Sequence, residues 1–332
     1  MLGCVAILGY GDEAKLRDPN APSPTGEGGA DTGPGTTPES GSPDTSTPID
    51  GGGKGMFVAV GDRGFKISSA DGVTWTGGET PNAGEDGYLT SVAFGNGKVV
   101  AAGWDIYTST NGVDWTKQKR LDQWLGGIAF GRNKWLGAGG VGQRAESEDG
   151  ESWGFLQTNN GGDYDGLAFG AVGGGRFVGH RRNGSLSLSD TGASWVDVVE
   201  AEAASIVFAQ GAYVGVGNEE RPTKNVRRSL DGTTWTTVYT ASVDLQSIAY
   251  GHMGFVAVSR FGDRVATSPD GITWQERVAA GAEGAIAAGG GRYVCCGGFP
   301  LKCHHSTDGV KWNDATSVPN GGLRGIGFGM VR

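Results

Sequence analysis

The sequence predicts an all-β protein, specifically a seven-bladed β-propeller built from four-stranded antiparallel blades. Two observations predict it. Short segments rich in Val, Ile, Phe and Tyr alternate with clusters of Gly, Asp and Ser along most of the 332 residues, which is typical of many short strands joined by tight turns. A turn ending in tryptophan also recurs at intervals of roughly forty residues, a period that indicates a propeller, a solenoid or another repeat array.

The recurring turn has the form S-x-[DN]-G-x-x-W, as in "SADGVTW", "STNGVDW" and "SPDGITW", with one looser copy, "SDTGASW". Its Asp or Asn side chain is suited to accept backbone N–H groups two residues on, and its Gly adopts a positive φ at little cost. Its Trp supplies a large apolar surface for packing. The seven copies contribute Asp71 and Trp75, Asn111 and Trp115, Asp149 and Trp153, Asp190 and Trp195, Asp231 and Trp235, Asp270 and Trp274, and Asp308 and Trp312.

The strands of each blade precede and follow this turn. Segments such as "SVAFGNGKVVAAG" and "SIAYGHMGFVAVS" indicate two strands joined by a tight turn, and "RVATS" and "TWTTVYT" are typical third and fourth strands. The first unit begins at its second strand, "GMFVAVG", and the chain ends on an isolated first strand, "LRGIGFGMVR". We therefore expect the C-terminal strand to complete the first blade beside residues 56–61, because a closed ring leaves no unpaired sheet edge.

The N-terminal part of the chain predicts two further segments before the propeller. Residues 1–17 are interpreted as the remnant of a signal or lipoprotein N-terminus, residues 18–55 as a disordered linker, and residues 56–332 as the propeller. The linker holds seven of the twelve prolines and almost no apolar residues, so it cannot bury enough surface to offset the entropy lost on ordering. Leu2-Gly3-Cys4 resembles the end of a bacterial lipoprotein signal, which implies lipidation of Cys4 and an exported protein, either an outer-membrane lipoprotein or extracellular.

The repeated turn resembles the Asp-box, or BNR, repeat of sialidases, sortilin-type receptors, xyloglucanases and the photosystem II assembly factor. Six of the copies are one residue shorter than the common S-x-D-x-G-x-x-W form. The resemblance covers residues 56–332 and implies a propeller in which these turns lie at the blade periphery, away from any ligand. It therefore supports the fold and leaves the function open.

Composition excludes several classes of protein. The net charge of −9 argues against nucleic-acid binding, because such affinity comes from Lys and Arg that neutralise phosphates. No run of apolar residues is long enough for a transmembrane helix, so membrane attachment is expected only through the lipid anchor. We expect a monomer without a cofactor.

Arginine is concentrated in the loops between the second and third strands of the blades, where propellers often bind ligands. Guanidinium groups bind carboxylate, sulfate or phosphate in a bidentate manner, so these loops suggest an acidic glycan or an acidic protein surface as ligand. The alternative is salt bridging to acidic residues of neighbouring loops, such as Asp163, Asp165 and Glu283. The insertion at 217–228 is the expected specificity loop. The ligand-binding candidates are Arg63, Arg144, Arg181, Arg182, Arg227 and Arg264.

Two functions follow from these features. The first is a non-catalytic binding or scaffold propeller at the bacterial cell envelope, with no catalytic residue assigned. The second is a glycan-active hydrolase with its site at the channel mouth, since sialidases, which this repeat resembles, hold the substrate carboxylate with three arginines. The R-I-P motif of sialidases is absent. An inverting glycosidase would need two carboxylates across a cleft, for which Asp163 with Asp165, or Glu85 with Asp86, are the candidates.

The segment "YVCCGGFPLKCHH" offers a second candidate site. Its thiols and imidazoles are of the kind that bind zinc or copper. The alternative, favoured because no CxxC spacing is present and because an exported protein meets an oxidising compartment, is a disulfide from Cys303 to Cys295 or Cys296. His180 and His252 are isolated and are interpreted as ordinary blade residues. The potential ligands are Cys295, Cys296, Cys303, His304 and His305.

Overall fold

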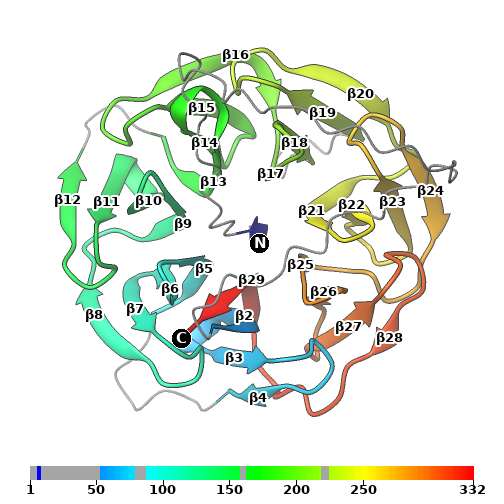
Figure 1. Cartoon of the computed structure of the whole chain (residues 1–332), viewed down its shortest axis with the longest axis horizontal. Helices are drawn as coiled ribbons and strands as arrows, with labels where there is room; N and C mark the ends of the chain where they lie inside the picture. The colour runs from blue at the N-terminus through cyan, green and yellow to red at the C-terminus, as the bar shows by residue number, and fades with distance from the viewer. Residues whose placement is uncertain (1–5, 9–52, 79–86, 158–161, 218–223) are drawn as a thin grey trace, which may run out of the picture. The chain divides into compact units, whose positions relative to one another are not determined.

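The computed structural model describes residues 6–8, 53–78, 87–157, 162–217 and 224–332. The lipidation site predicted at Cys4, the carboxylates Glu85 and Asp86, most of the predicted linker and residues 218–223 of the predicted specificity loop lie outside these residues. The described strands belong to one compact unit and form seven sheets arranged in a ring, as the sequence predicts (Figure 1). Within the described residues, no helix is long and apolar enough to cross a membrane.

Blades two to seven follow in chain order, each with its first strand nearest the ring centre (Figure 1). The second contains β5 (Leu89–Gly95), β6 (Lys98–Gly103), β7 (Asp105–Ser109) and β8 (Thr116–Arg120), and the third contains β9 (Leu125–Gly131), β10 (Lys134–Gly139), β11 (Gln143–Ser147) and β12 (Gly154–Gln157). The fourth contains β13 (Tyr164–Gly170), β14 (Arg176–Arg181), β15 (Ser185–Ser189) and β16 (Val196–Glu202), and the fifth contains β17 (Ser205–Ala209), β18 (Ala212–Val216), β19 (Asn225–Ser229) and β20 (Thr236–Thr240). The sixth contains β21 (Leu245–Gly251), β22 (Gly254–Ser259), β23 (Arg264–Ser268) and β24 (Gln275–Val278), and the seventh contains β25 (Ala285–Gly289), β26 (Arg292–Gly297), β27 (Lys302–Ser306) and β28 (Asn313–Asp314). Short 3₁₀ turns occur at η1 (Asp62–Gly64), η2 (Gly140–Gly142) and η3 (Val172–Gly174).

The first blade is closed by the C-terminal strand, which confirms the predicted closure. Its strands are β29 (Leu323–Val331), β2 (Lys54–Gly61), β3 (Lys66–Ser69) and β4 (Thr76–Gly77). The antiparallel register of β2 and β29 places Phe57 opposite Phe328, and β2 begins at Lys54 rather than at residue 56. A short strand, β1 (Ala6–Leu8), pairs in parallel with β29 on the side toward the ring centre (Figure 1).

The repeated tryptophans explain how adjacent blades are joined. Among the described residues, seven hydrophobic clusters lie between neighbouring blades, and each includes the Trp of a different turn. Trp274 of the sixth blade, for example, packs with Phe255 and with Val214 of the fifth blade. Trp75 and Trp274 are buried, and the other five are half-buried. Each Trp therefore packs against the preceding blade. Because every interface between blades needs one such Trp, the tryptophans recur once per blade, about every forty residues.

Six of the seven turns share one hydrogen-bond pattern. In the first, the Asp71 Oδ1 atom accepts the N–H groups of Val73 and Thr74 at 2.8 and 2.9 Å, and the Ser69 hydroxyl accepts the N–H of Gly72 at 2.8 Å. Gly72 adopts φ +72°, a conformation that other residues rarely tolerate. The same bonds form around Asn111, Asp149, Asp231, Asp270 and Asp308.

These hydrogen bonds also lower the pKa values of the turn carboxyl groups. The N–H groups of Ser152 and Glu151 hold the pKa of Asp149 well below its usual range. Those of Thr273 and Ile272 lower the pKa of Asp270 to about 2. Because these oxygens already accept structural hydrogen bonds, the turn acids serve the fold and are poor candidates for acid–base chemistry.

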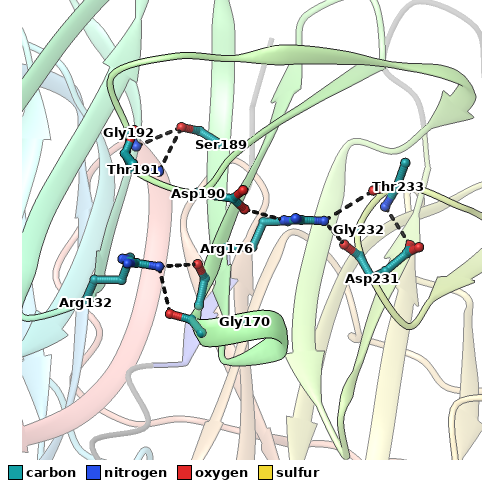
Figure 2. Close-up of polar contacts among 12 residues, drawn as sticks. Arg132, Gly170, Arg176, Ser189, Asp190, Thr191, Gly192, Asp231, Gly232 and Thr233 are labelled. Carbon is teal, nitrogen blue, oxygen red and sulfur yellow. Dashed lines mark hydrogen bonds and ion pairs between the residues drawn. The ribbon is translucent and has the colours of Figure 1, made fainter.

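The fourth turn departs from the pattern expected from the sequence (Figure 2). Asp190 accepts a bond from Arg176 Nε at 2.6 Å, and the Thr191 hydroxyl accepts the turn N–H of Ala193 at 3.2 Å in its place. Arg176 also donates to the Asp231 carbonyl at 2.7 Å. In "SDTGASW" the acid comes one residue earlier than in the other copies and Thr191 takes its place in the turn, so Asp190 instead holds an arginine that bridges the fourth and fifth blades.

Candidate functional site

The two faces of the ring differ in what they carry. The turns just described lie on one face, together with the short links between first and second strands; we call it the turn face. The loops between second and third strands and the connections between blades lie on the opposite side; we call it the loop face. The arginines predicted to bind a ligand occur on or beside the loop face.

Two of these arginines lie over the same tyrosine ring of the fourth blade. The guanidinium of Arg144 lies 5.2 Å from the ring centroid of Trp195 and 5.8 Å from that of Tyr164, and Arg144 is only 4% exposed. Arg181 lies over the same Tyr164 ring at 5.3 Å and forms an ion pair with Asp197 at 2.6 Å. Arg144 of the third blade therefore packs against the fourth blade, out of reach of a surface ligand, whereas the contacts of Arg181 lie within the fourth blade.

The other predicted arginines lie on separate blades. Arg182 forms an ion pair with Asp165 at 3.4 Å, and Arg264 lies 3.9 Å from Glu276. Arg227 lies within β19, opposite Gly215 and Thr237. Arg63 is exposed at the tip of η1, with φ 53°. The structure thus brings Arg144 and Arg181 together and distributes the remaining four around the ring.

The loop face carries a feature that the sequence interpretation did not single out: arginines stacked over aromatic rings in consecutive sectors. The rings come from the connections leading into the second and third blades and from the loop after β6. Tyr88 is 43% exposed, and Trp104 and Trp124 are half-buried. Guanidinium-to-ring distances are 4.5 Å for Arg324 over Tyr88, 6.0 Å for Arg120 over Trp104 and 5.2 Å for Arg182 over Trp124.

Each stacked guanidinium is also held by a carboxylate. Arg324 pairs with Asp62, Arg120 with Asp105 at 3.1 Å, and Arg182 with Asp165 at 3.4 Å. A ring on one side and a carboxylate on another fix the direction of each guanidinium, so little side-chain entropy remains to be lost on binding. We call these six residues, Tyr88, Trp104, Trp124, Arg120, Arg182 and Arg324, the aromatic sector.

Backbone hydrogen bonds position the rings of the aromatic sector. The Trp104 N–H donates to the Tyr88 carbonyl at 3.0 Å, and the Gly140 N–H donates to the Trp124 carbonyl at 2.9 Å. A Cβ on Gly140 would lie 2.5 Å from the indole nitrogen of Trp124, so only glycine allows the indole to lie against this loop. A sequence signal for these residues exists, because Trp104 and Trp124 fall outside the forty-residue period and within predicted loops.

The cysteine and histidine residues of the seventh blade have separate structural partners. Of the two pairings left open by the sequence, the structure has Cys296 joined to Cys303. Cys295 is a buried thiol whose pKa is raised by that burial. His304 Nδ1 lies 3.0 Å from Asp314, and His305 Nδ1 lies 3.2 Å from Arg292. Within the described part of the chain, no three His, Cys, Asp or Glu side chains converge as metal ligands would.

The remaining predicted residues also serve the scaffold. His180 is buried, and burial lowers its pKa to about 4, so the imidazole is neutral at physiological pH. Of the carboxylates considered for a glycosidase, the two that lie among the described residues are engaged, since Asp163 accepts the N–H of Val141 at 2.8 Å and Asp165 pairs with Arg182.

Comparison with solved structures identifies other propellers. The chain is similar to YCF48 bound to D1 peptide, at 17% identity and a TM-score of 0.53 over 69% of this chain and 81% of that one. It is similar to a chain of a nidogen–laminin complex, at 12% identity and a TM-score of 0.53 over 70% and 97%. A catalytically inactive virginiamycin B lyase from Staphylococcus aureus, solved with quinupristin, has 13% identity and a TM-score of 0.59 over 75% and 94%.

At such identities the likeness shows the propeller fold alone, and binding proteins and a lyase share it. No protein-family model matches the chain. No curated protein sequence matches it either.

Proposed function

We propose that this protein is a non-catalytic binding propeller of the bacterial cell envelope that recognises a partner protein on its loop face. The observation that carries the proposal is the aromatic sector. Tyr, Trp and Arg are the residue types most enriched in the energetically dominant positions of protein interfaces. Here they form three adjacent, preorganised pairs on a rigid ring.

The chemistry beside the aromatic sector favours an acidic partner surface. Arg63 is exposed and has no ion-pair partner among the described residues. The N–H of the adjacent Gly64 donates to the Gly87 carbonyl at 2.7 Å, which places this loop next to Tyr88. An acidic segment would therefore meet the exposed Arg63 guanidinium and several stacked ones.

Structures of the same fold support the choice of a protein partner. One neighbour is described as YCF48 bound to D1 peptide and another as a nidogen–laminin complex, so propellers of this shape bind peptides and proteins. The envelope location rests on the resemblance of Leu2-Gly3-Cys4 to a lipoprotein signal and on the proline-rich segment that follows. The Asp-box identity of the turns is part of the same proposal, supported by their shared hydrogen bonds.

The test uses defined probes and matched variants of the full chain. We expect a fluorescein-labelled, repeating Leu-Glu-Gly peptide to bind saturably in fluorescence anisotropy at about 50 mM salt, where the Debye length exceeds 10 Å. Tyr88→Ala and Arg182→Ala should each weaken binding by about tenfold, the usual effect of an interface hot spot. Ile272→Ala and Lys311→Ala, which change exposed residues of the turn face, should leave it unchanged.

Two results would contradict the proposal. Absence of saturable binding to the acidic peptide would remove its basis, as would equal losses in the sector variants and the controls. Release of reducing sugar from a polyanionic glycan by the full chain, lost in Asp165→Asn, would instead favour the glycan hydrolase.

A further inference from the structure

A second part of the loop face presents two phenylalanines to solvent. Phe261 lies in the loop between β22 and β23 and is 78% exposed, and Phe299 lies in the loop between β26 and β27 and is 95% exposed. Phenylalanine is normally withdrawn from water. Its exposure at the tips of loops from two consecutive blades marks a candidate contact surface.

The two loops are neighbours because the connection between the sixth and seventh blades runs between them. A Cβ on Gly262 would lie 2.8 Å from Cβ of Glu283, and a Cβ on Gly298 would lie 2.7 Å from its Oε1 atom. Gly262 follows Phe261 and Gly298 precedes Phe299 in the chain. Glu283 therefore stands between the two phenylalanine loops.

Both loops are held in place by contacts at their bases. The disulfide between Cys296 and Cys303 closes the loop that carries Phe299, and Leu301 of the same loop is buried in the adjacent core. In the other loop, the Ser259 hydroxyl donates to Asp263 at 2.9 Å and accepts the N–H of Arg264 at 3.1 Å. The phenylalanines are thus held out by the fold, so little conformational entropy remains to be lost on binding.

The charge between the two phenylalanine loops determines which partner side chains they can bind. Glu283 is half-buried and has no ion-pair partner among the described residues, whereas nearby Arg264 lies beside Glu276. The face of a phenylalanine ring attracts cations, and a carboxylate forms charge-assisted hydrogen bonds with Lys or Arg. Arg260, which precedes Phe261, opposes an incoming cation, so its removal should tighten binding.

We infer that Phe261, Phe299 and Glu283 form a docking site for a partner segment that carries a Lys or Arg beside an apolar side chain. This inference rests on the proposed function, because it assumes a protein partner on the loop face. The aromatic sector is proposed to bind an acidic segment, whereas this site would bind a basic one. The two regions would therefore contact different parts of a partner.

The experiment measures anisotropy of a fluorescein-labelled, repeating Leu-Lys-Gly peptide with the full chain. Phe261→Ala and Phe299→Ala should each weaken binding by about tenfold. Glu283→Gln should weaken it several-fold and remove most of its salt dependence, and Arg260→Ala should strengthen it. The controls are Met253→Ala, 59% exposed on the turn face, and Glu148→Gln, an exposed acid of the third turn, and both should bind as the parent does.

Several outcomes would overturn this inference. The first is an equal loss of affinity for the Leu-Lys-Gly peptide in Met253→Ala and in the phenylalanine variants. The second is the absence of saturable binding of this peptide to the parent protein. The third is binding to phosphatidylcholine vesicles that needs both phenylalanines but not Glu283, which would assign the surface to a membrane. Absence of basic-peptide binding, with acidic-peptide binding at the aromatic sector retained, would refute this inference alone. Absence of acidic-peptide binding, with basic-peptide binding retained, would refute the acidic partner proposed for the aromatic sector and would leave this docking site on the loop face supported.

Discussion

Replacing the turn tryptophans with alanine should destabilise the ring in proportion to how deeply each is buried. Trp75 is 1% exposed and packs with Phe57 and Phe65 at the closure between the seventh and first blades. Trp235 is half-buried, with its ring centroid 6.3 Å from that of Tyr213 and its indole N–H donating to the Gly232 carbonyl at 2.8 Å. The two positions provide an internal comparison within one protein.

The magnitudes follow from burial. Removal of a fully buried aromatic side chain costs about 3–5 kcal/mol, which we expect for Trp75→Ala. Trp235 keeps part of its surface in water, so Trp235→Ala should lower the free energy of unfolding by about 2–3 kcal/mol. This loss combines the lost packing with about 1 kcal/mol for the indole hydrogen bond. Trp235→Phe, which retains much of the packing, should cost less than Trp235→Ala.

The assay is urea unfolding followed by tryptophan fluorescence and circular dichroism, with coincident transitions required before free energies are derived. Ile272→Ala, at an exposed position of the turn face, is the control and should lie within about 0.5 kcal/mol of the parent. A change below about 1 kcal/mol for Trp235→Ala, or a larger loss for Trp235→Ala than for Trp75→Ala, would refute the interblade packing.

Three further predictions concern the scaffold. Deletion of residues 323–332 removes β29 and exposes the edge of β2, so we expect aggregation or loss of cooperative melting; melting like the full chain would contradict ring closure. The pKa of Asp270 is lowered to about 2 by backbone N–H groups. Its stabilising effect is therefore present above the unfolded pKa of about 3.9 and lost as the pH falls toward 2, and Asp270→Asn, the residue type that the second turn uses at Asn111, should reduce the acid dependence in pH-dependent urea titrations. Cys295 is buried and its thiol pKa is raised by burial, so iodoacetamide should label it only after unfolding, and labelling of the native protein at neutral pH would show that the interface between the sixth and seventh blades opens.

The sequence predicted the ring well because its signals are local and periodic. The spacing of Trp75 to Trp312 sets the blade number, and the separation of "GMFVAVG" from "LRGIGFGMVR" predicts the closure. The side against which each Trp packs was not predictable, because the turn motif describes one blade and the packing involves two. The fourth turn shows the same limit, since the partner of Asp190 is an arginine from another strand.

The site was less predictable for a related reason. Loop membership placed Arg144 and Arg182 in one class, yet Arg144 is buried between Trp195 and Tyr164 whereas Arg182 lies over Trp124 on the loop face. The difference depends on which aromatic ring of another blade meets each guanidinium. Such contacts join residues far apart in the sequence, and hydrophobic pattern or turn chemistry does not encode them.

The most direct test of the central claim, that the loop face is the partner-binding surface, is hydrogen–deuterium exchange of the full chain with and without the Leu-Glu-Gly peptide. We predict slower exchange in the connection that carries Tyr88, in the loop that carries Trp104 and in the segment from Asp122 to Trp124. No change is expected at His252 and Met253 on the turn face. Protection confined to the turn face, or none at a peptide concentration that saturates the anisotropy signal, would contradict the claim.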